Sequence, residues 1–71
     1  MAGRWLEPKA EMTYRYVIAN DEYMDKIDMA HTKKERKINA RMLVDAACEV
    51  LKNNLSEEDR EAVVYFLAGK N

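Results

Sequence analysis

The chain has 71 residues, a net charge of −1, a single cysteine and a single histidine. This composition excludes an intrachain disulfide and gives no support to a metal site, a membrane span or a signal peptide, so we expect a cytoplasmic protein of one domain without metal or cofactor. Because so small a chain buries a modest fraction of its surface, we expect a partner chain to stabilise it.

Residues 1–11 are expected to form an N-terminal arm. Gly3 and Pro8 lie close together in this arm, and no periodic apolar face follows them. Pro8 also suits the first position of a helix, because its fixed φ fits there and its missing N–H would have no partner. A helix from residue 8 to residue 19 is therefore the alternative to an arm followed by a strand.

Residues 12–18 have the two-residue period of a β-strand. One side of this strand would carry Tyr14, Tyr16 and Ile18, and the other side would carry Thr13, Arg15 and Val17. Aromatic and β-branched residues dominate the segment, as a pleated surface prefers. We therefore predict a short strand here, followed by no second strand in the chain.

The first predicted helix covers residues 21–31. Asn20 or Asp21 can cap it, because a short polar side chain there accepts hydrogen bonds from the first free N–H groups. Its apolar stripe consists of Tyr23, Met24, Ile27 and Ala30.

The second predicted helix has two competing starts. Thr32 with Glu35 matches a capping box, and this start would allow one continuous helix over residues 21–53. Asn39 is also a good N-cap and directly precedes the strongest amphipathic run of the chain. We place the helix at residues 40–53. Adjacent apolar pairs recur there every four residues and predict one buried face: Met42, Leu43, Ala46, Ala47, Val50 and Leu51.

A third helix is predicted within the C-terminal segment, residues 55–71. Ser56 suits its N-cap, and three acidic residues follow in the first turn, where the helix dipole favours negative charge. Gly69 is expected to end it.

The predicted order is strand, helix, helix and C-terminal helix. A lone strand is not stable in water, and the simplest remedy is antiparallel pairing with the same strand of a second copy. We therefore predict a mainly α fold with one short β-strand. In it, residues 12–54 form an intertwined homodimer with an intermolecular two-stranded ribbon, and residues 55–71 add a helix.

Charge is distributed unevenly along the chain. Residues 9–41 hold eight Lys or Arg and six Asp or Glu, a balance of +2, whereas residues 42–71 hold three bases and six acids, a balance of −3. A dense basic cluster with one acid inside it is formed by Lys33, Lys34, Arg36, Lys37 and Arg41. Such a run is usually a solvated face, and the competing interpretation is a contact with phosphate groups.

Residues 12–53 resemble the ribbon-helix-helix family of DNA-binding proteins, which includes the Arc and MetJ repressors and the DNA-binding end of the conjugation protein TraM. Val17-Ile18-Ala19, followed by Asn20-Asp21-Glu22-Tyr23 and Lys26-Ile27, is similar to the strand-to-helix junction of TraM-type proteins. The run from Asn39 to Ala46 stands where the family usually shows a Ser or Asn cap and an apolar-rich helix.

The resemblance implies that the ribbon lies in the major groove of DNA. Thr13, Arg15 and Val17 would then face base edges, with Arg15 bonding two acceptors of guanine. The resemblance also implies phosphate contacts at the start of the second helix and in the basic residues before it: Lys33, Lys34, Arg36, Lys37, Asn39, Ala40 and Arg41.

The resulting hypothesis is a homodimeric protein that binds a specific sequence of double-stranded DNA. It would be a repressor, an antitoxin-like autoregulator or a relaxosome accessory factor, would assemble further on tandem sites, and would offer its acidic C-terminal helix to a protein partner. The sequence does not indicate the DNA target.

The alternative hypothesis is a small helical protein–protein interaction module, such as a phage-type inhibitor of a host protein. Five methionines, four tyrosines and Trp5 suit adaptable contacts, and Tyr14, Tyr16 and Tyr23 would lie on an exposed helical patch. An enzyme is not expected, because the chain has no glycine-rich phosphate loop and no nucleophile with a base at motif spacing.

Overall fold

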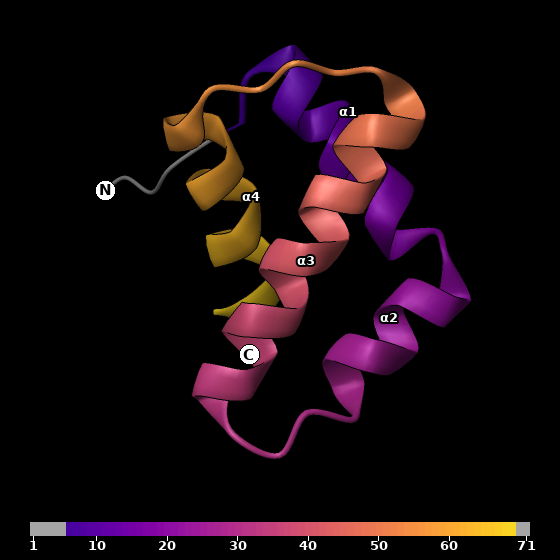
Figure 1. Ribbon diagram of the computed structural model, residues 1–71, viewed down its shortest axis with the longest axis vertical. Helices are drawn as coiled ribbons and strands as arrows, with labels where there is room; N and C mark the ends of the chain where they lie inside the picture. Colours follow the sequence, from indigo (N-terminus) through magenta and orange to yellow (C-terminus); the bar gives the residue numbers. More distant parts are fainter. Residues whose placement is uncertain (1–5, 70–71) are drawn as a thin grey trace.

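The computed structural model describes residues 6–69, which form four helices joined by short connections (Figure 1). The helices are α1 Pro8–Ile18, α2 Asp21–Asp28, α3 Lys33–Leu51 and α4 Glu57–Ala68. No strand occurs within residues 6–69, so the predicted strand and the intermolecular ribbon built on it are wrong.

The segment predicted as a strand, residues 12–18, lies in α1, and the alternative of a helix starting at Pro8 is the correct one. Ala10, Thr13 and Val17 are fully buried. Their spacing of three and four residues is the period of a helix and not that of a strand. The alternation of side-chain types over residues 13–18 therefore does not indicate a strand. Thr13 and Val17 belong to the buried face of a helix, and Ala10 lies on the same face one turn earlier.

Asn20 is the N-cap of α2, as predicted. Its side-chain oxygen accepts hydrogen bonds from the N–H groups of Glu22, at 3.1 Å, and Tyr23, at 3.3 Å. α2 ends at Asp28, three residues earlier than expected.

α3 begins at Lys33 and not at residue 40, so the capping-box start is correct and the start at Asn39 is wrong. The Thr32 hydroxyl accepts a hydrogen bond from the N–H of Glu35 at 3.0 Å, and the Glu35 carboxylate accepts one from the N–H of His31 at 3.0 Å. Residues 29–32 separate α2 from α3, which also rules out one continuous helix over residues 21–53.

α4 has the predicted ends. The Ser56 hydroxyl accepts a hydrogen bond from the N–H of Asp59 at 3.1 Å. At the other end, the N–H of Gly69 donates to the carbonyl oxygen of Tyr65 at 2.8 Å, and a Cβ at position 69 would lie only 2.9 Å from that oxygen. Glycine therefore fits where a larger residue would force the backbone to shift.

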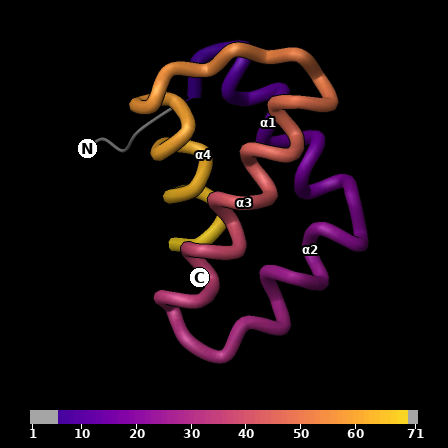
Figure 2. Tube along the Cα trace, in the orientation of Figure 1, coloured from indigo at the N-terminus to yellow at the C-terminus, as the bar shows by residue number. Residues whose placement is uncertain are grey.

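α3 is the central helix of the fold. α2 runs antiparallel to α3 on one side, α4 runs antiparallel to α3 on the other side, and α1 packs behind it (Figures 1 and 2). The buried apolar side chains come from all four helices and from the connection before α4: Ala10, Val17, Ile27, Ala40, Leu43, Val44, Ala47, Cys48, Leu55, Val63, Val64, Leu67 and Ala68.

The tyrosines expected on an exposed patch instead pack the helices together. Tyr14, Tyr16 and Tyr23 are all half-buried. The rings of Tyr16 and Tyr23 join α1 to α2 edge to face with their centroids 6.0 Å apart, and the rings of Tyr14 and Phe66 join α1 to α4 in the same way at 5.9 Å. This prediction of an exposed tyrosine patch is therefore wrong.

Candidate functional site

α3 has two apolar sides, and only one of them faces the core. The buried side consists of Ala40, Leu43, Val44, Ala47 and Cys48. Away from this side, Ile38, Met42 and Val50 have 51%, 63% and 57% of their surface exposed, with Ile38 and Met42 directly opposite the core and Val50 on the flank. Their spacing of four and eight residues, with the half-buried Ala46 in the gap, places them in one row along the helix. We call Ile38, Met42, Ala46 and Val50 the outward stripe.

The outward stripe corrects the prediction that residues 40–53 have a single buried face. In each of the adjacent pairs Met42-Leu43 and Val50-Leu51, the first residue faces solvent and the second packs inward or is half-buried. Adjacent residues on a helix are separated by about 100° around its axis. A series of adjacent apolar pairs therefore forms an apolar arc that is wider than the part of the helix that packs against the core.

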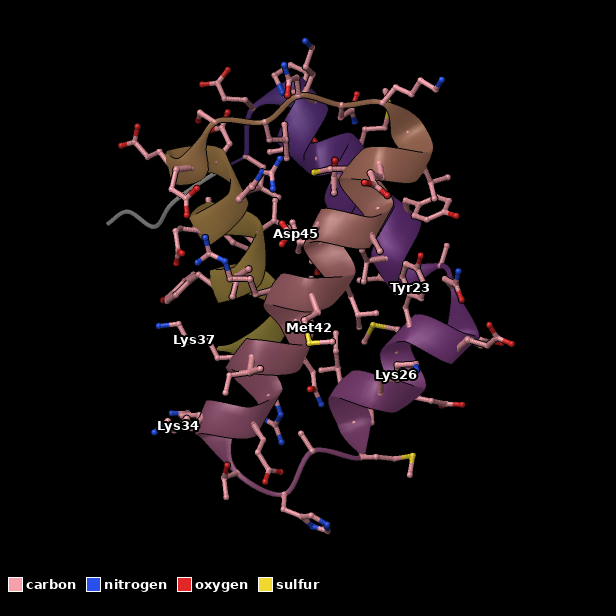
Figure 3. The ribbon with its side chains drawn as sticks, viewed as in Figure 1. Tyr23, Lys26, Lys34, Lys37, Met42 and Asp45 are labelled. Atoms are coloured by element: carbon pink, nitrogen blue, oxygen red, sulfur yellow. The ribbon has the colours of Figure 1, made fainter. Side chains whose placement is uncertain are left out.

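Three lysines surround the part of the outward stripe that lies nearest the start of α3. In Figure 3, Met42 lies on the viewer's side of α3, Lys26 of α2 lies to one side of it, and Lys34 and Lys37 lie to the other. The side-chain amide of Asn39 donates to the backbone carbonyl of Lys26 at 3.1 Å, which fixes α2 against α3 at this level. Lys26, Lys34, Lys37, Ile38 and Met42 together are called the α2–α3 surface.

The charge of the α2–α3 surface is not neutralised within the described part of the chain. None of Lys26, Lys34 and Lys37 forms an ion pair with residues 6–69. The nearby carboxylate of Glu35 is engaged with the N–H of His31. The N-terminal end of the α3 dipole adds positive potential at the same place. The surface therefore combines an apolar centre with an unpaired lysine on each side. The α3 side is predominantly basic, whereas Lys26 is the one base of α2, a helix that also carries four acidic residues.

The opposite end of the outward stripe differs in charge. Asp45 forms an ion pair with Arg60 of α4 at 2.7 Å, and Glu49 lies one turn further along α3. An acidic ligand would therefore meet repulsion near Glu49 and attraction near Lys34, which restricts the attractive part of the face to the first half of α3.

The residues predicted to face DNA bases all lie on α1. Thr13 and Val17 are fully buried, and the Arg15 guanidinium pairs with Glu11 one turn earlier at 2.8 Å. The structure therefore does not bring these three side chains together on one exposed surface.

The residues predicted to contact phosphate divide into two groups. Lys33, Lys34 and Lys37 are exposed and Arg36 is half-buried, all in the first turns of α3. Asn39, Ala40 and Arg41 lie inside the helix, where Ala40 is fully buried. Because α3 begins seven residues earlier than predicted, the N–H groups at 40 and 41 are not free helix-terminal donors.

Comparison of the chain with protein-family models, with curated proteins and with solved structures gives no match. The function is therefore argued from the chain's own surface. Within residues 6–69, no helix has the length and apolar character to cross a membrane, and no group of three or more His, Cys, Asp or Glu side chains could hold a metal ion.

Arg41 connects α3 to α4. Its guanidinium forms ion pairs with Glu57 and Glu61, and the hydrogen bond with Glu57 is the main reason that the pKa of Arg41 is raised. Arg41 is thus engaged in packing the two helices together, whereas Lys34 and Lys37 of α3 and Lys26 of α2 form no ion pair within residues 6–69.

A surface depression lies at the C-terminal end of α3, next to the connection to α4. Its lining is mostly polar and consists of Asp45, Cys48, Glu49, Lys52, Asn53, Asn54 and Arg60. Burial raises the pKa of the Cys48 thiol, so the thiol is held neutral and is a weak nucleophile. Arg60 lowers the pKa of this thiol and Asp45 raises it, so the two members of the ion pair act against each other.

Proposed function

We propose that this protein is a small helical protein-interaction module that docks its partner on the outward face of α3. The observation that carries the proposal is the exposed row of Ile38 and Met42 on the side of α3 opposite the core. Single exposed apolar side chains are common on protein surfaces and need no explanation. A row of them on one helix, with the core satisfied on the other side, suits a helix-against-helix contact.

The chemistry of the row supports a protein partner. Methionine is flexible and polarizable, so it adapts to irregular apolar surfaces. Met42 is central in the α2–α3 surface, with charged side chains around it (Figure 3). An apolar centre with a polar rim is the usual composition of a protein–protein interface.

The test compares partner capture by two variants in which exposed apolar side chains are replaced by serine. Ile38→Ser/Met42→Ser removes the centre of the docking face, and Met12→Ser removes another exposed methionine, 54% exposed, from α1. Each tagged protein is cross-linked in cells of its natural source, the captured protein is identified by mass spectrometry, and binding is then measured with the purified partner.

We expect Ile38→Ser/Met42→Ser to weaken binding of the purified partner at least about tenfold, since central apolar anchors dominate interface energies. Met12→Ser should bind as the wild type does. Equal binding by all three proteins would refute the α3 docking face.

A second candidate function is binding of nucleic acid without a ribbon. It is favoured by Lys33, Lys34 and Lys37, which are all exposed on the first turns of α3. If three phosphates were neutralised, the logarithm of the binding constant for duplex DNA would fall with the logarithm of salt concentration with a slope of about −2.7. A mobility-shift series on a DNA duplex at low salt tests this, and no binding at low salt excludes it.

A further inference from the structure

We infer that the partner presents an acidic amphipathic helix, which packs its apolar side on Ile38 and Met42 and places carboxylates opposite Lys26, Lys34 and Lys37. This inference rests on the proposed function and specifies its partner. It follows from three observations: the length of the α2–α3 surface, the position of its charges and the lack of a matching helix within residues 6–69.

The length of the surface suits a short helix. From Lys34 to Ala46, α3 rises about 18 Å at 1.5 Å per residue. A helix of about twelve residues packed along this length has about three turns, and its middle turn would lie against Ile38 and Met42. Antiparallel α2 ends within the same length, so the bound helix would touch both α2 and α3 (Figure 2).

The charges lie on both sides of the apolar centre. Lys26 projects from α2 on one side, and Lys34 and Lys37 project from α3 on the other (Figure 3). A helix docked by its apolar side would have each flank beside a lysine, so acidic residues can pair on both flanks. The preference is strongest on the flank beside Lys34 and Lys37, because α2 also carries four acidic residues. Because these lysines have no ion pair within residues 6–69, binding breaks no existing pair.

A second copy of the chain does not supply this ligand from its described helices. Two helices, α2 and α4, have an acidic first turn. The apolar side of α2 already faces the core, since Ile27 is buried and Tyr23 and Met24 pack against the core. The apolar side of α4 is used in the same way, since its buried residues are Val63, Val64, Leu67 and Ala68. A helix from another protein is therefore the better match.

Nucleic acid matches the surface less well than an acidic helix. A phosphate backbone would satisfy the lysines, but it would place charged oxygens against Ile38 and Met42 and leave their apolar surface without a partner. We therefore treat duplex DNA as a competing outcome of the test.

The probe is a fluorescein-labelled synthetic peptide of eighteen residues, with leucines on one helical side and glutamates on both flanks. A matched peptide has lysine at every glutamate position.

Fluorescence anisotropy measures the binding of each peptide to the wild type and to three variants. Ile38→Ser/Met42→Ser removes the apolar centre, Lys26→Glu/Lys34→Glu reverses the flanks, and Lys52→Glu reverses an exposed lysine at the other end of α3. Circular dichroism confirms that each variant remains helical.

We expect the glutamate peptide to bind the wild type at least tenfold more tightly than the lysine peptide does. Both double variants should lose at least tenfold, and Lys52→Glu should bind as the wild type does. Equal binding of the two peptides, or an equal loss in Lys52→Glu, would overturn the inference. So would binding of a twenty-base-pair duplex that disappears in Lys26→Glu/Lys34→Glu and survives in Ile38→Ser/Met42→Ser.

The two proposals fail separately. If Ile38→Ser/Met42→Ser loses the natural partner but the peptides bind equally, the docking face stands and the acidic helix is wrong. If all variants keep the natural partner, the docking face itself is wrong.

Discussion

Asn53, in the connection after α3, donates a hydrogen bond to the buried hydroxyl of Thr13 on α1, with 3.2 Å between Nδ2 and Oγ1. The Thr13 hydroxyl in turn donates to the carbonyl oxygen of Lys9 at 3.1 Å, and the Asn53 amide lies 3.4 Å from the same oxygen. Thr13 is the one buried polar side chain among residues 6–69. This contact therefore fixes the connection between α3 and α4 to the first helix.

Thr13→Val and Asn53→Ala should each lower the free energy of unfolding by about 1 kcal/mol, because each removes one partner of the same hydrogen bond. Urea denaturation of both single variants and of the double variant measures the coupling. Since the two changes remove one shared interaction, the double variant should cost less than the sum of the single ones. Fully additive costs would show that the contact contributes nothing.

Lys52→Gly should raise the free energy of unfolding by about 0.5–1 kcal/mol, because glycine adopts a positive φ without the steric cost that a side chain imposes. Lys52 ends α3 in the left-handed conformation, with φ 56°. Lys52→Ala is the control and should change stability little, since alanine keeps the cost. Equal stability of the glycine and alanine variants would contradict this explanation of the helix end.

Arg41→Gln should lower the Tm by a few degrees at most, because its ion pairs with Glu57 and Glu61 are largely exposed to solvent. The difference from the wild type should shrink in about 1 M salt, where surface charges are screened. Thermal unfolding followed by circular dichroism at low and high salt provides the measurement. A loss that is unchanged by salt would mean that the side chain acts through packing.

Burial raises the pKa of the Cys48 thiol, so the folded protein holds the neutral thiol more firmly than the unfolded chain does. The associated stabilisation is complete below the thiol pKa of the unfolded chain, about 8.5, and is lost as the pH rises through the higher folded-state pKa. Between about pH 7.5 and pH 10 the wild type should therefore lose more unfolding free energy than Cys48→Ala. Parallel losses in urea titrations at the two pH values would show that the thiol does not contribute.

Some helix ends could be predicted from the sequence because each depends on a few neighbouring residues, whereas the end of α2 and the start of α3 were misplaced. Asn20, Thr32 and Ser56 all act as N-caps through their own side chains, and Gly69 ends α4. Thr32 and Asn39 are both favourable N-cap residues, so local sequence alone did not decide which of them begins the helix. The structure uses the earlier one, and Asn39 instead donates its amide to Lys26 across the helix pair.

The strand prediction was wrong because seven residues are too few to separate the period of a strand from that of a helix. The decisive residues lie earlier. Pro8 suits the first position of a helix, and Ala10 extends the buried face of Thr13 and Val17 to about two turns. The ion pair of Glu11 with Arg15 is a further helical signal, since residues four apart are neighbours only on a helix.

The candidate site could be predicted only in part. The basic cluster that begins at Lys33 was visible as a charge run, and the structure places Lys34 and Lys37 beside the apolar row (Figure 3). Ile38 and Met42 were missed, because a sequence shows that a residue is apolar but not whether its side of the helix is covered. The sequence did contain one indication of an exposed apolar row: the apolar residues of α3 span a wider arc of the helix than its contact with the core requires.

The most direct test of the docking face is a nuclear magnetic resonance titration of the labelled protein with the glutamate peptide. We predict that the backbone amides of Lys34 and Ile38 and the methyl group of Met42 shift with peptide concentration, whereas the methyl group of Met12 and the signals of Lys52 stay in place. Shifts centred on α1 or α4 would contradict the α2–α3 surface as the binding site, and no shifts at all would contradict an acidic helix as its ligand.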